Sequence, residues 1–502
     1  MTTALGSSSL TPVAAGLAPA GRPLVPLLVE SLELHSRVRP EAVAVRDDSG
    51  AVTYAELHAR VSRLADAIET ADLPARVAVR AGNDVAHLAA LLALPATGRT
   101  GVVMDPRWTV NELVAAREAF GATVMLTDQP DAEALEGSGF EVHDLGAAAG
   151  SGDGPSDRVL RTVAGPDGTF LVTPGGGTSG RIKGSRITHA AQISRIVTQL
   201  VEFGIPAGGT FLASTPLFHG SARSLGLGYL YCGGTVHLMQ KFDVQRWLRA
   251  AEDATATFCV PTMLRRLVEA AEHPLDPRLR LLTGGAPIEQ ELVERVRRRL
   301  TPRFFDYYAS VESGPITVRH PNEHDLPAGC VGRPAFSVQV EIRDPDDQGI
   351  GRVVVGGPGI STGVEGAAEP IAEGAEIEMG DLGRFDAAGR LHLHGRADDV
   401  IISGGVNVEP SEVEAVLEVH PDVRAAAVVG VPDAEWGRRV VAAVVTASGR
   451  ALPEGELDGY LRSRLAPAKR PKEVRYVTEL PLTGVGKVDR RAVVEVFTGR
   501  AR

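Results

Sequence analysis

A glycine-rich stretch in the first half of the chain contains the residue types that bind phosphate. Three consecutive glycines at residues 175–177 precede the hydroxyls of Thr178 and Ser179, then Gly180 and the cation Lys183. Glycine lets backbone N–H groups turn toward an anion, and two hydroxyls with one ammonium complete a phosphate cradle. The stretch is not a Walker A loop, because no lysine directly follows Gly180. A flexible glycine linker that carries a lysine is the alternative interpretation.

The elements on both sides of this cradle predict how it is held. An apolar run at residues 169–173 is typical of a strand, and apolar residues at helical spacing begin at Ile193. Strand-like runs alternate with helical patterns from residue 24 to about residue 282, which predicts an α/β fold with packed sheets. From about residue 329 to residue 394, shorter alternating runs predict a small β-barrel-like unit.

The residue pattern changes near Gly395, and this change predicts a domain boundary. Three of the four residues after this glycine are charged. About a hundred residues follow, which is within the size of one domain, and they show a β, α, β, β, α, β pattern. We therefore predict a flexible leader at residues 1–25, a large N-terminal domain at residues 26–395 and a small α+β C-terminal domain at residues 396–502.

Composition indicates an ordinary globular chain with more than one core. The chain has 502 residues and a net charge of −11, so it has no electrostatic reason to bind nucleic acid. Its three cysteines lie far apart, which argues against a disulfide framework or a zinc site and favours a reducing compartment. No apolar run is long enough to cross a bilayer, and no basic segment opens the chain as in a secretory signal. We expect a cytoplasmic protein that binds neither membrane nor nucleic acid.

Seven stretches beyond the cradle carry a resemblance to a known family. They are Pro216-Leu-Phe-His219, Gly284-Gly-Ala-Pro287, Tyr307-Tyr-Ala-Ser-Val-Glu-Ser313, Gly380-Asp381, Gly395-Arg-Ala-Asp-Asp-Val400, the run from Ser403 to Glu414 and the run from Pro481 to Arg490. Together with the cradle, and in this order, they resemble the adenylate-forming superfamily of acyl-CoA synthetases, peptide-synthetase adenylation domains and luciferases. The resemblance implies a large N-terminal domain and a small mobile C-terminal domain, in agreement with the boundary near Gly395.

The family reaction implied by this resemblance has two steps. A carboxylate attacks the α-phosphate of ATP to give an acyl-adenylate and pyrophosphate, and a thiol then displaces AMP. Because the first step brings two anions together, it requires positive charge and a metal ion. By resemblance, Glu312 binds Mg²⁺, Lys487 bridges carboxylate and α-phosphate, and His219 lines the acyl pocket. The implied cofactors are ATP or an acyl-adenylate, Mg²⁺ and coenzyme A; a solvated glutamate, a surface lysine and a structural histidine are the alternatives.

The resemblance also assigns residues to the nucleotide, to a hinge and to CoA. The ATP and AMP contacts are Thr178, Ser179, Gly180, Lys183, Gly284, Gly285, Ala286, Tyr308, Ala309, Asp381 and Arg396. A carboxylate such as Asp381 only accepts hydrogen bonds, which suits two ribose hydroxyls, and Tyr308 would stack beside adenine. Asp398 matches the hinge position, and Ser403, Gly404 and Gly405 would face the CoA channel.

Three departures from the family pattern lie on the ATP-activating side. Glycines at 175 and 176 replace the usual hydroxyls, Ala309 replaces the usual glycine, and Val311 replaces the usual threonine before Glu312. Two hypotheses follow. Either ATP activation is slowed but intact, which the presence of Lys487 favours, or the enzyme mainly transfers a supplied acyl-adenylate to CoA.

Other functions and the identity of the acid stay open at this point. The chain could be a stand-alone ligase that loads a carrier protein, or, outside the enzyme class, a non-catalytic adenylate-binding protein. Small residues, such as Gly226 and Gly228, favour a hydrophobic or bulky carboxylic acid of secondary metabolism, and Arg223 is a candidate cation for a second carboxylate. The partners expected are this small-molecule acid and CoA, with a homodimer left open.

Overall fold

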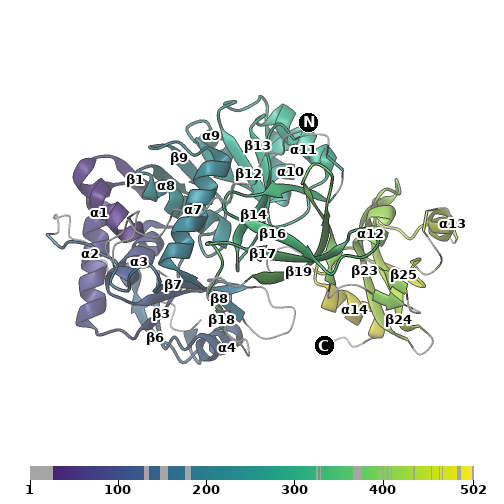
Figure 1. Cartoon of the computed structure of the whole chain (residues 1–502), viewed down its shortest axis with the longest axis horizontal. Coiled ribbons are helices and arrows are strands. Elements are labelled where there is room, and N and C mark those ends of the chain that lie inside the picture. The colour runs from purple at the N-terminus through teal and green to yellow at the C-terminus, as the bar shows by residue number, and fades with distance from the viewer. Residues whose placement is uncertain are drawn as a thin grey trace, which may run out of the picture.

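The computed structural model describes residues 26–499 except for short gaps. The gaps are residues 129–134, 147–156, 176–182, 324–325, 328, 366–375, 398–400, 404–405, 409, 434–435, 454, 463, 466, 468 and 483–487. The predicted leader at residues 1–25 lies outside the described residues. Figure 1 shows a large body and, beside it, a smaller unit formed by the C-terminal end of the chain.

A seven-stranded sheet carries the strands that flank the cradle. Its order is β18-β8-β7-β4-β3-β5-β6. The strands are β3 (Arg76–Arg80), β4 (Thr100–Val103), β5 (Val124–Thr127), β6 (Glu141–Asp144), β7 (Thr169–Gly175), β8 (Lys183–Thr188) and β18 (Gly363–Glu365). Strands β7, β4, β3, β5 and β6 pair in parallel, whereas β8 is antiparallel to β7 and β18. The central parallel strands are almost continuously apolar and buried, as expected when helices cover both faces.

A thirteen-stranded sheet forms the rest of the large body. Its order is β16-β17-β19-β20-β15-β14-β13-β12-β11-β9-β10-β1-β2. The strands are β1 (Val43–Asp47), β2 (Gly50–Thr53), β9 (Thr210–Ala213), β10 (Thr235–Leu238), β11 (Ala256–Phe258), β12 (Arg280–Gly284), β13 (Phe304–Ser310), β14 (Gly314–Arg319), β15 (Cys330–Pro334), β16 (Gln339–Arg343), β17 (Gly351–Gly356), β19 (Ile377–Phe385) and β20 (Leu391–Arg396). The strands predicted as a β-barrel-like unit are β15 to β20 without β18, and they continue this sheet through β14.

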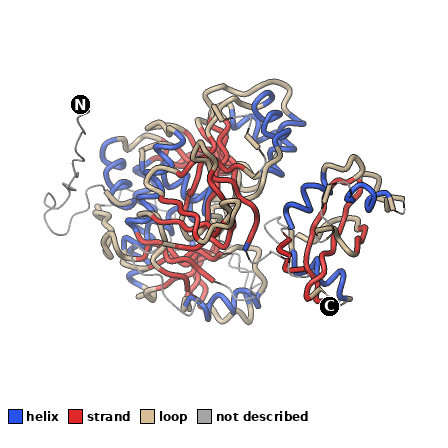
Figure 2. The backbone as a smooth tube through the Cα atoms, turned by 45° about the vertical axis from the view of Figure 1, so that its right-hand side comes forward, coloured by secondary structure: helices blue, strands red, loops and turns tan. Residues whose placement is uncertain are grey.

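Helices cover the two sheets, as Figure 2 shows in blue around the red strands. They are α1 (Leu28–Val38), α2 (Tyr54–Thr70), α3 (Val85–Ala96), α4 (Val110–Phe120), α7 (His189–Phe203), α8 (Gly220–Tyr231), α9 (Val244–Ala251), α10 (Pro261–Ala270) and α11 (Gln290–Arg299). Helix α7 packs on α8 and on β14, and it buries Arg195 and Gln192 as well as apolar residues. Helix α7 therefore contacts both a neighbouring helix and a strand of the thirteen-stranded sheet. None of the described helices is long and apolar enough to cross a bilayer.

The smaller unit has its own sheet, with apolar clusters on both faces. Its elements are β21 (Ile401–Ser403), β22 (Val406–Val408), α12 (Pro410–Glu418), β23 (Val423–Asp433), β24 (Gly437–Thr446), α13 (Glu456–Arg462), β25 (Glu473–Tyr476) and α14 (Arg490–Thr498). Among the described strands, none of this sheet pairs with either sheet of the large body. The exact boundary at residue 395 stays a prediction.

Most predicted elements occur where the apolar pattern placed them, and β6, β8 and α14 are among those that were missed. Strand β8 begins directly after the cradle, where the sequence analysis expected only a connection to a helix. The terminal helix α14 lies beyond the last predicted strand. The sequence of β8 mixes charge with glycine, so its periodicity is weak, whereas α14 is amphipathic and buries Val493 and Phe497.

Candidate active site

The cradle connects two paired strands. Residue Gly175 at the end of β7 is opposite Lys183 at the start of β8. Gly184 follows in β8, where a Cβ atom would lie 2.7 Å from the ring of Phe120, so this position admits only glycine without a shift. Lys183 is exposed. The predicted residues Thr178, Ser179 and Gly180 lie outside the described residues.

Glu312 lies on a tight turn between β13 and β14. Within this turn, which we call the Glu312 turn (residues 311–313), the N–H of Ser313 donates to Oγ of Ser310 at 3.1 Å. The backbone oxygen of Glu312 accepts from Nη2 of Arg195 at 2.8 Å and from the N–H of Ser361 at 2.7 Å. The turn is thus fixed through its backbone, while the Glu312 side chain is half-buried.

The predicted ribose and adenine residues come together into one cluster, which we call the Asp381 cluster (Tyr308, Asp381 and Arg396). Asp381 in β19 and Arg396 in β20 are direct cross-strand partners, and Nη1 of Arg396 lies 3.5 Å from Oδ1 of Asp381. The hydroxyl of Tyr308 in β13 donates a short hydrogen bond to the other carboxylate oxygen. Burial and the nearby Asp381 carboxylate raise the pKa of Tyr308 well above its ordinary value, so Tyr308 keeps its proton and acts as a donor.

The close approach of these side chains requires the glycine before Asp381. Gly380 has φ of +68°, and a Cβ atom there would lie 2.8 Å from Nη2 of Arg396. Gly380 is therefore favoured for its backbone conformation, and a larger residue would also displace the end of the Arg396 side chain.

The glycine-rich end of β12 lies beside the strand that carries Tyr308. Gly284 pairs with Tyr307, and a Cβ atom on Gly284 would lie 2.6 Å from the backbone carbonyl oxygen of Tyr307. Gly285 follows with φ of +79°, and both Gly285 and Ala286 are exposed. Ala309 follows Tyr308 at an irregularity of the β13–β14 pair and packs against the core. An exposed backbone edge therefore runs alongside the Asp381 cluster.

His219 lies at the start of α8, as the N-cap residue. Its backbone N–H donates to Pro216 O at 3.0 Å, and its ring lies 4.5 Å from the ring of Phe218. Burial lowers the pKa of His219 to about 4, although the nearby Asp105 carboxylate opposes the shift. His219 is therefore neutral at pH 7.

Arg223, one turn further along α8, is buried with 2% exposure. Its guanidinium donates to the backbone oxygens of Leu217 and Phe218 at 3.1 and 3.0 Å, and to Oγ1 of Thr173 at 2.7 Å. Thr173 lies in β7, just before the cradle. Arg223 thus joins the His219 turn to the cradle strand with a buried positive charge.

The small unit contributes few described site residues. Ser403 ends β21 and is fully buried, and its Oγ has no hydrogen-bond partner among the described residues. Gly404, Gly405, the predicted hinge Asp398 and Lys487 lie outside the described residues. Their roles stay predictions.

The donor set fits Mg²⁺ bound together with phosphate. Among the described residues, no group of three or more His, Cys, Asp or Glu side chains could hold a metal ion. Mg²⁺ commonly takes only one or two carboxylates and fills its other positions with water and substrate phosphate. A half-buried Glu312 that no described side chain engages suits that role.

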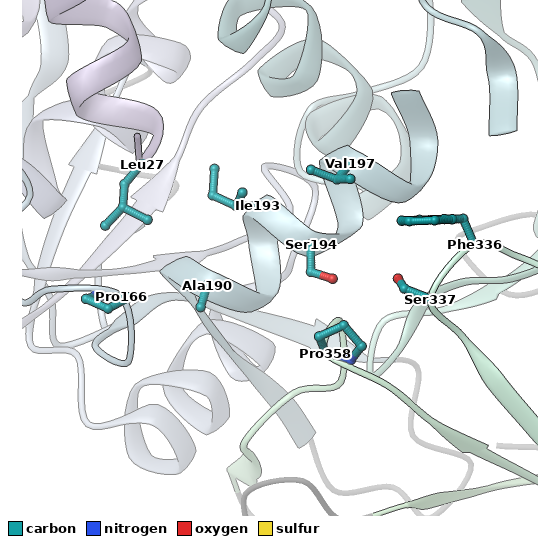
Figure 3. A pocket seen from close by; sticks show the side chains of 9 residues that line it. All are labelled: Leu27, Pro166, Ala190, Ile193, Ser194, Val197, Phe336, Ser337 and Pro358. Atoms are coloured by element: carbon teal, nitrogen blue, oxygen red, sulfur yellow. The ribbon is translucent and has the colours of Figure 1, made fainter. Parts of the chain in front are cut away.

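A hollow on another side of α7 is separate from these residues. It has a volume of about 330 Å³ and is lined mainly by apolar side chains, as Figure 3 shows: Leu27, Pro166, Ala190, Ile193, Ser194, Val197, Phe336, Ser337 and Pro358. No predicted site residue lines it.

Two residues of the site were not predicted from the sequence. Arg195 contacts the Glu312 turn, and Thr173 binds Arg223. A signal for Arg195 was present, because it lies between Ile193 and Ile196 on the helix whose apolar face was predicted. A charge beside a buried helix face indicates a specific partner.

Comparison with known families identifies what this chain is similar to. The model of the AMP-binding enzyme family matches residues 32–364, and that of the AMP-binding enzyme C-terminal domain matches residues 412–487. A feruloyl-CoA synthase from Amycolatopsis sp is 35% identical over 473 residues, which cover 90% of this chain and 95% of that protein.

Solved structures share the fold. The o-succinylbenzoate CoA synthetase (MenE) from Bacillus subtilis, in complex with the acyl-adenylate intermediate OSB-AMP, has a TM-score of 0.83 and 27% identity, covering 92% of this chain and 97% of that chain. The amide bond synthetase McbA from Marinactinospora thermotolerans has a TM-score of 0.80 and 32% identity, covering 93% and 99%. These likenesses confirm the predicted α/β fold with a large N-terminal and a small C-terminal domain.

Proposed function

This chain belongs to the AMP-binding enzyme family, and we propose that it is an acid–thiol ligase that converts a hydrophobic or bulky carboxylic acid to its CoA thioester through an acyl-adenylate. It uses ATP, Mg²⁺ and coenzyme A. The Mg²⁺ ion, when bound, neutralises phosphate charge and polarises the reacting phosphate.

The observation that carries this proposal is the Asp381 cluster beside the Glu312 turn. Tyr308 and Glu312 are four residues apart on one hairpin, so a nucleotide whose ribose meets Asp381 has its phosphates directed along that hairpin. Asp381 accepts from the ribose hydroxyls, and Tyr308 and Arg396 hold its carboxylate in place. The exposed backbone of Gly285 and Ala286 offers the adjoining surface to adenine.

Charge supports the proposed chemistry at the other end. Arg195 and Arg223 are both buried, and the positive charge of Arg223 lowers the pKa of both Arg195 and His219. A carboxylate and a phosphate approach each other more easily where fixed positive charge is shielded from water. The neutral His219 between Phe218 and Arg223 suits the wall of an acyl pocket, since it adds no further charge.

The small residues of α8 do not support the proposal of a bulky acid. Gly226 and Gly228 do not open space, because Cβ atoms there would make ordinary contacts at 3.6 Å with Val236 and Ile196. Their small size packs α8 against its neighbours. Support for a bulky acid comes instead from the relatives, which include the feruloyl-CoA synthase and an indoleacetate–CoA ligase from Aromatoleum aromaticum.

The alternatives are not favoured by these relatives. Carrier-protein loading and a non-catalytic role both predict relatives of other kinds, whereas the feruloyl-CoA synthase and the indoleacetate–CoA ligase are both CoA ligases. A weakened ATP half-reaction stays testable, because Gly175, Gly176, Ala309 and Val311 depart from the family pattern at positions that the resemblance assigns to the ATP side.

A product assay tests the function directly. The protein is incubated with ATP, Mg²⁺ and a panel of aromatic and aliphatic acids, with CoA, a phosphopantetheinylated carrier protein or an amine as acceptor. AMP release and product mass are measured, and the same acids are supplied as preformed adenylates. We expect acyl-CoA from aromatic or long acids. Formation of amide or carrier thioester in place of acyl-CoA would contradict the proposal.

A further inference from the structure

Arg195 occupies an unusual place for a charged residue. It lies on α7, is 6% exposed, and directs its whole guanidinium at backbone oxygens. Nε donates to Gly359 O at 2.7 Å, Nη1 to Val311 O at 3.1 Å and Nη2 to Glu312 O at 2.8 Å. We propose that Arg195 is a positioning residue that fixes the Glu312 turn against α7, and so sets the place of the metal-binding carboxylate. This inference rests on the proposed function.

The path of the Arg195 side chain is reserved by two glycines. A Cβ atom on Gly314 would lie 2.8 Å from Cγ of Arg195, and one on Gly359 would lie 3.3 Å from the same atom. Gly314 directly follows the Glu312 turn and has φ of +74°. The stem therefore passes between the two segments whose oxygens the guanidinium binds, and larger residues on either side would displace it.

The charge on Arg195 has no close counter-ion among the described residues. Burial lowers the pKa of Arg195 to about 9, with the Arg223 charge in the same direction and the Glu312 carboxylate opposing. Three charge-assisted bonds to carbonyls offset part of the cost of burying a guanidinium. A planar fork is required to reach three oxygens on two segments, and lysine offers only a point charge.

The position of Arg195 links the two phosphate-binding elements. Helix α7 follows β8, and β8 begins at Lys183 directly after the cradle. The guanidinium thus ties the helix behind the cradle to the turn that carries Glu312. It does so through backbone oxygens, so the link does not depend on the hydroxyl that the family pattern has in place of Val311. Loss of the link would loosen Glu312 relative to the cradle while leaving the Asp381 cluster in place.

The inference predicts a specific defect in metal binding. In R195Q, the apparent affinity for Mn²⁺ in the presence of ATP, followed by electron paramagnetic resonance, should fall about tenfold. The Mg²⁺ concentration for half-maximal pyrophosphate–ATP exchange should rise by a similar factor. Conversion of supplied acyl-adenylate to thioester should stay close to that of the unmodified protein. R195K should show the same changes at smaller size, because it restores the charge and one of the bonds.

A matched control lies on the same helix. Nε of Arg280 donates to Phe203 O at 2.8 Å at the far end of α7, so R280Q removes a similar backbone bond away from the Glu312 turn. It should leave the metal dependence unchanged. G359A should weaken the same link, but it crowds both partners, because a Cβ atom there would lie 3.3 Å from Cγ of Arg195 and 3.2 Å from the backbone oxygen of Ser313 in the Glu312 turn.

The possible results distinguish a failure of the positioning role of Arg195 from a failure of the proposed function. If the unmodified protein binds Mn²⁺ with ATP and folded R195Q or R195K binds it equally well, the positioning role is wrong. Equal losses in both half-reactions would likewise reduce Arg195 to a structural residue. Failure of the unmodified protein to bind Mn²⁺ with ATP would instead contradict the proposed function. If R195Q does not fold, as judged by circular dichroism, R195K decides.

Discussion

The Asp381 cluster and the Glu312 turn lie on the same sheet, yet they are held in different ways. In the Asp381 cluster, side chains of β13, β19 and β20 contact each other directly, with Asp381 opposite Arg396 in the strand register. The Glu312 turn has no such partner for its side chain among the described residues. Its backbone is held from outside the sheet by Arg195 of α7 and by the N–H of Ser361.

We infer that the candidate site has a preformed end at the Asp381 cluster and an adjustable end at the Glu312 turn. The hydrogen bond from Tyr308 and the ion pair with Arg396 fix the carboxylate of Asp381, the proposed ribose acceptor, before ligand binds. A carboxylate that is positioned only through its backbone keeps rotamer freedom, which suits a ligand of a metal ion that arrives with ATP. The phosphate end therefore depends on charges that come from elsewhere, including Arg195, Arg223 and the predicted Lys487.

The largest effect is expected for Lys487, which the resemblance places at the phosphate end during adenylation. K487A should lower pyrophosphate–ATP exchange about 1,000-fold, because a cation between two reacting anions is lost. Thioester formation from a supplied acyl-adenylate should be little affected. The exposed Lys241 provides the control, as K241A. Equal exchange in K487A and K241A would contradict a role of Lys487 in adenylation.

A smaller effect is expected at the preformed end. D381N should lower kcat/KM for ATP about 100-fold, because two ribose hydroxyls lose a charged acceptor. The Mg²⁺ dependence should not change, in contrast to R195Q. On the same strand, Glu378 pairs with Arg352 near the surface, so E378Q serves as the control. A shift in Mg²⁺ dependence in D381N would show that the two ends are not separable.

Much of the fold could be predicted from the sequence, because buried parallel strands carry continuous apolar runs. The predicted residues 77–79 and 123–126 lie within one residue of β3 and β5 at each end. Strand β8 was missed because its sequence, Lys183–Thr188, mixes charge with glycine, and its pairing with β7 decides its conformation instead.

Individual candidate site residues could be named from the sequence, whereas their contacts could not. Tyr308 and Asp381 were both predicted, yet the hydrogen bond between them joins residues 73 positions apart and depends on five paired strands from β13 to β19. Arg195 was missed because its partners are backbone oxygens. Such acceptors leave no trace in residue type, so only the path of the chain reveals them.

The smallest effect concerns the start of α7, behind the cradle. His189 is 2% exposed, and burial lowers its pKa to about 4. The unfolded chain takes up a proton below about pH 6.5, but folded His189 does not, so the free energy of unfolding falls as pH decreases from 6.5 toward 4. Between pH 7 and pH 5 this amounts to at most about 2 kcal/mol for one histidine. His87 and His219 are also expected to contribute in this direction.

Comparison of H189L with the unmodified protein isolates the contribution of His189 to the pH dependence of the free energy of unfolding. Denaturant unfolding at pH 7 and pH 5 should show a shallower loss of stability in H189L, because a leucine does not titrate. H320Q is a control of opposite sign, since the Glu202 carboxylate raises the pKa of His320 and stabilises its charged form at low pH. If the loss between pH 7 and pH 5 is as steep in H189L as in the unmodified protein, His189 is not held neutral. Helix α7 would then begin with a histidine that becomes charged at low pH, which would add positive charge next to the cradle.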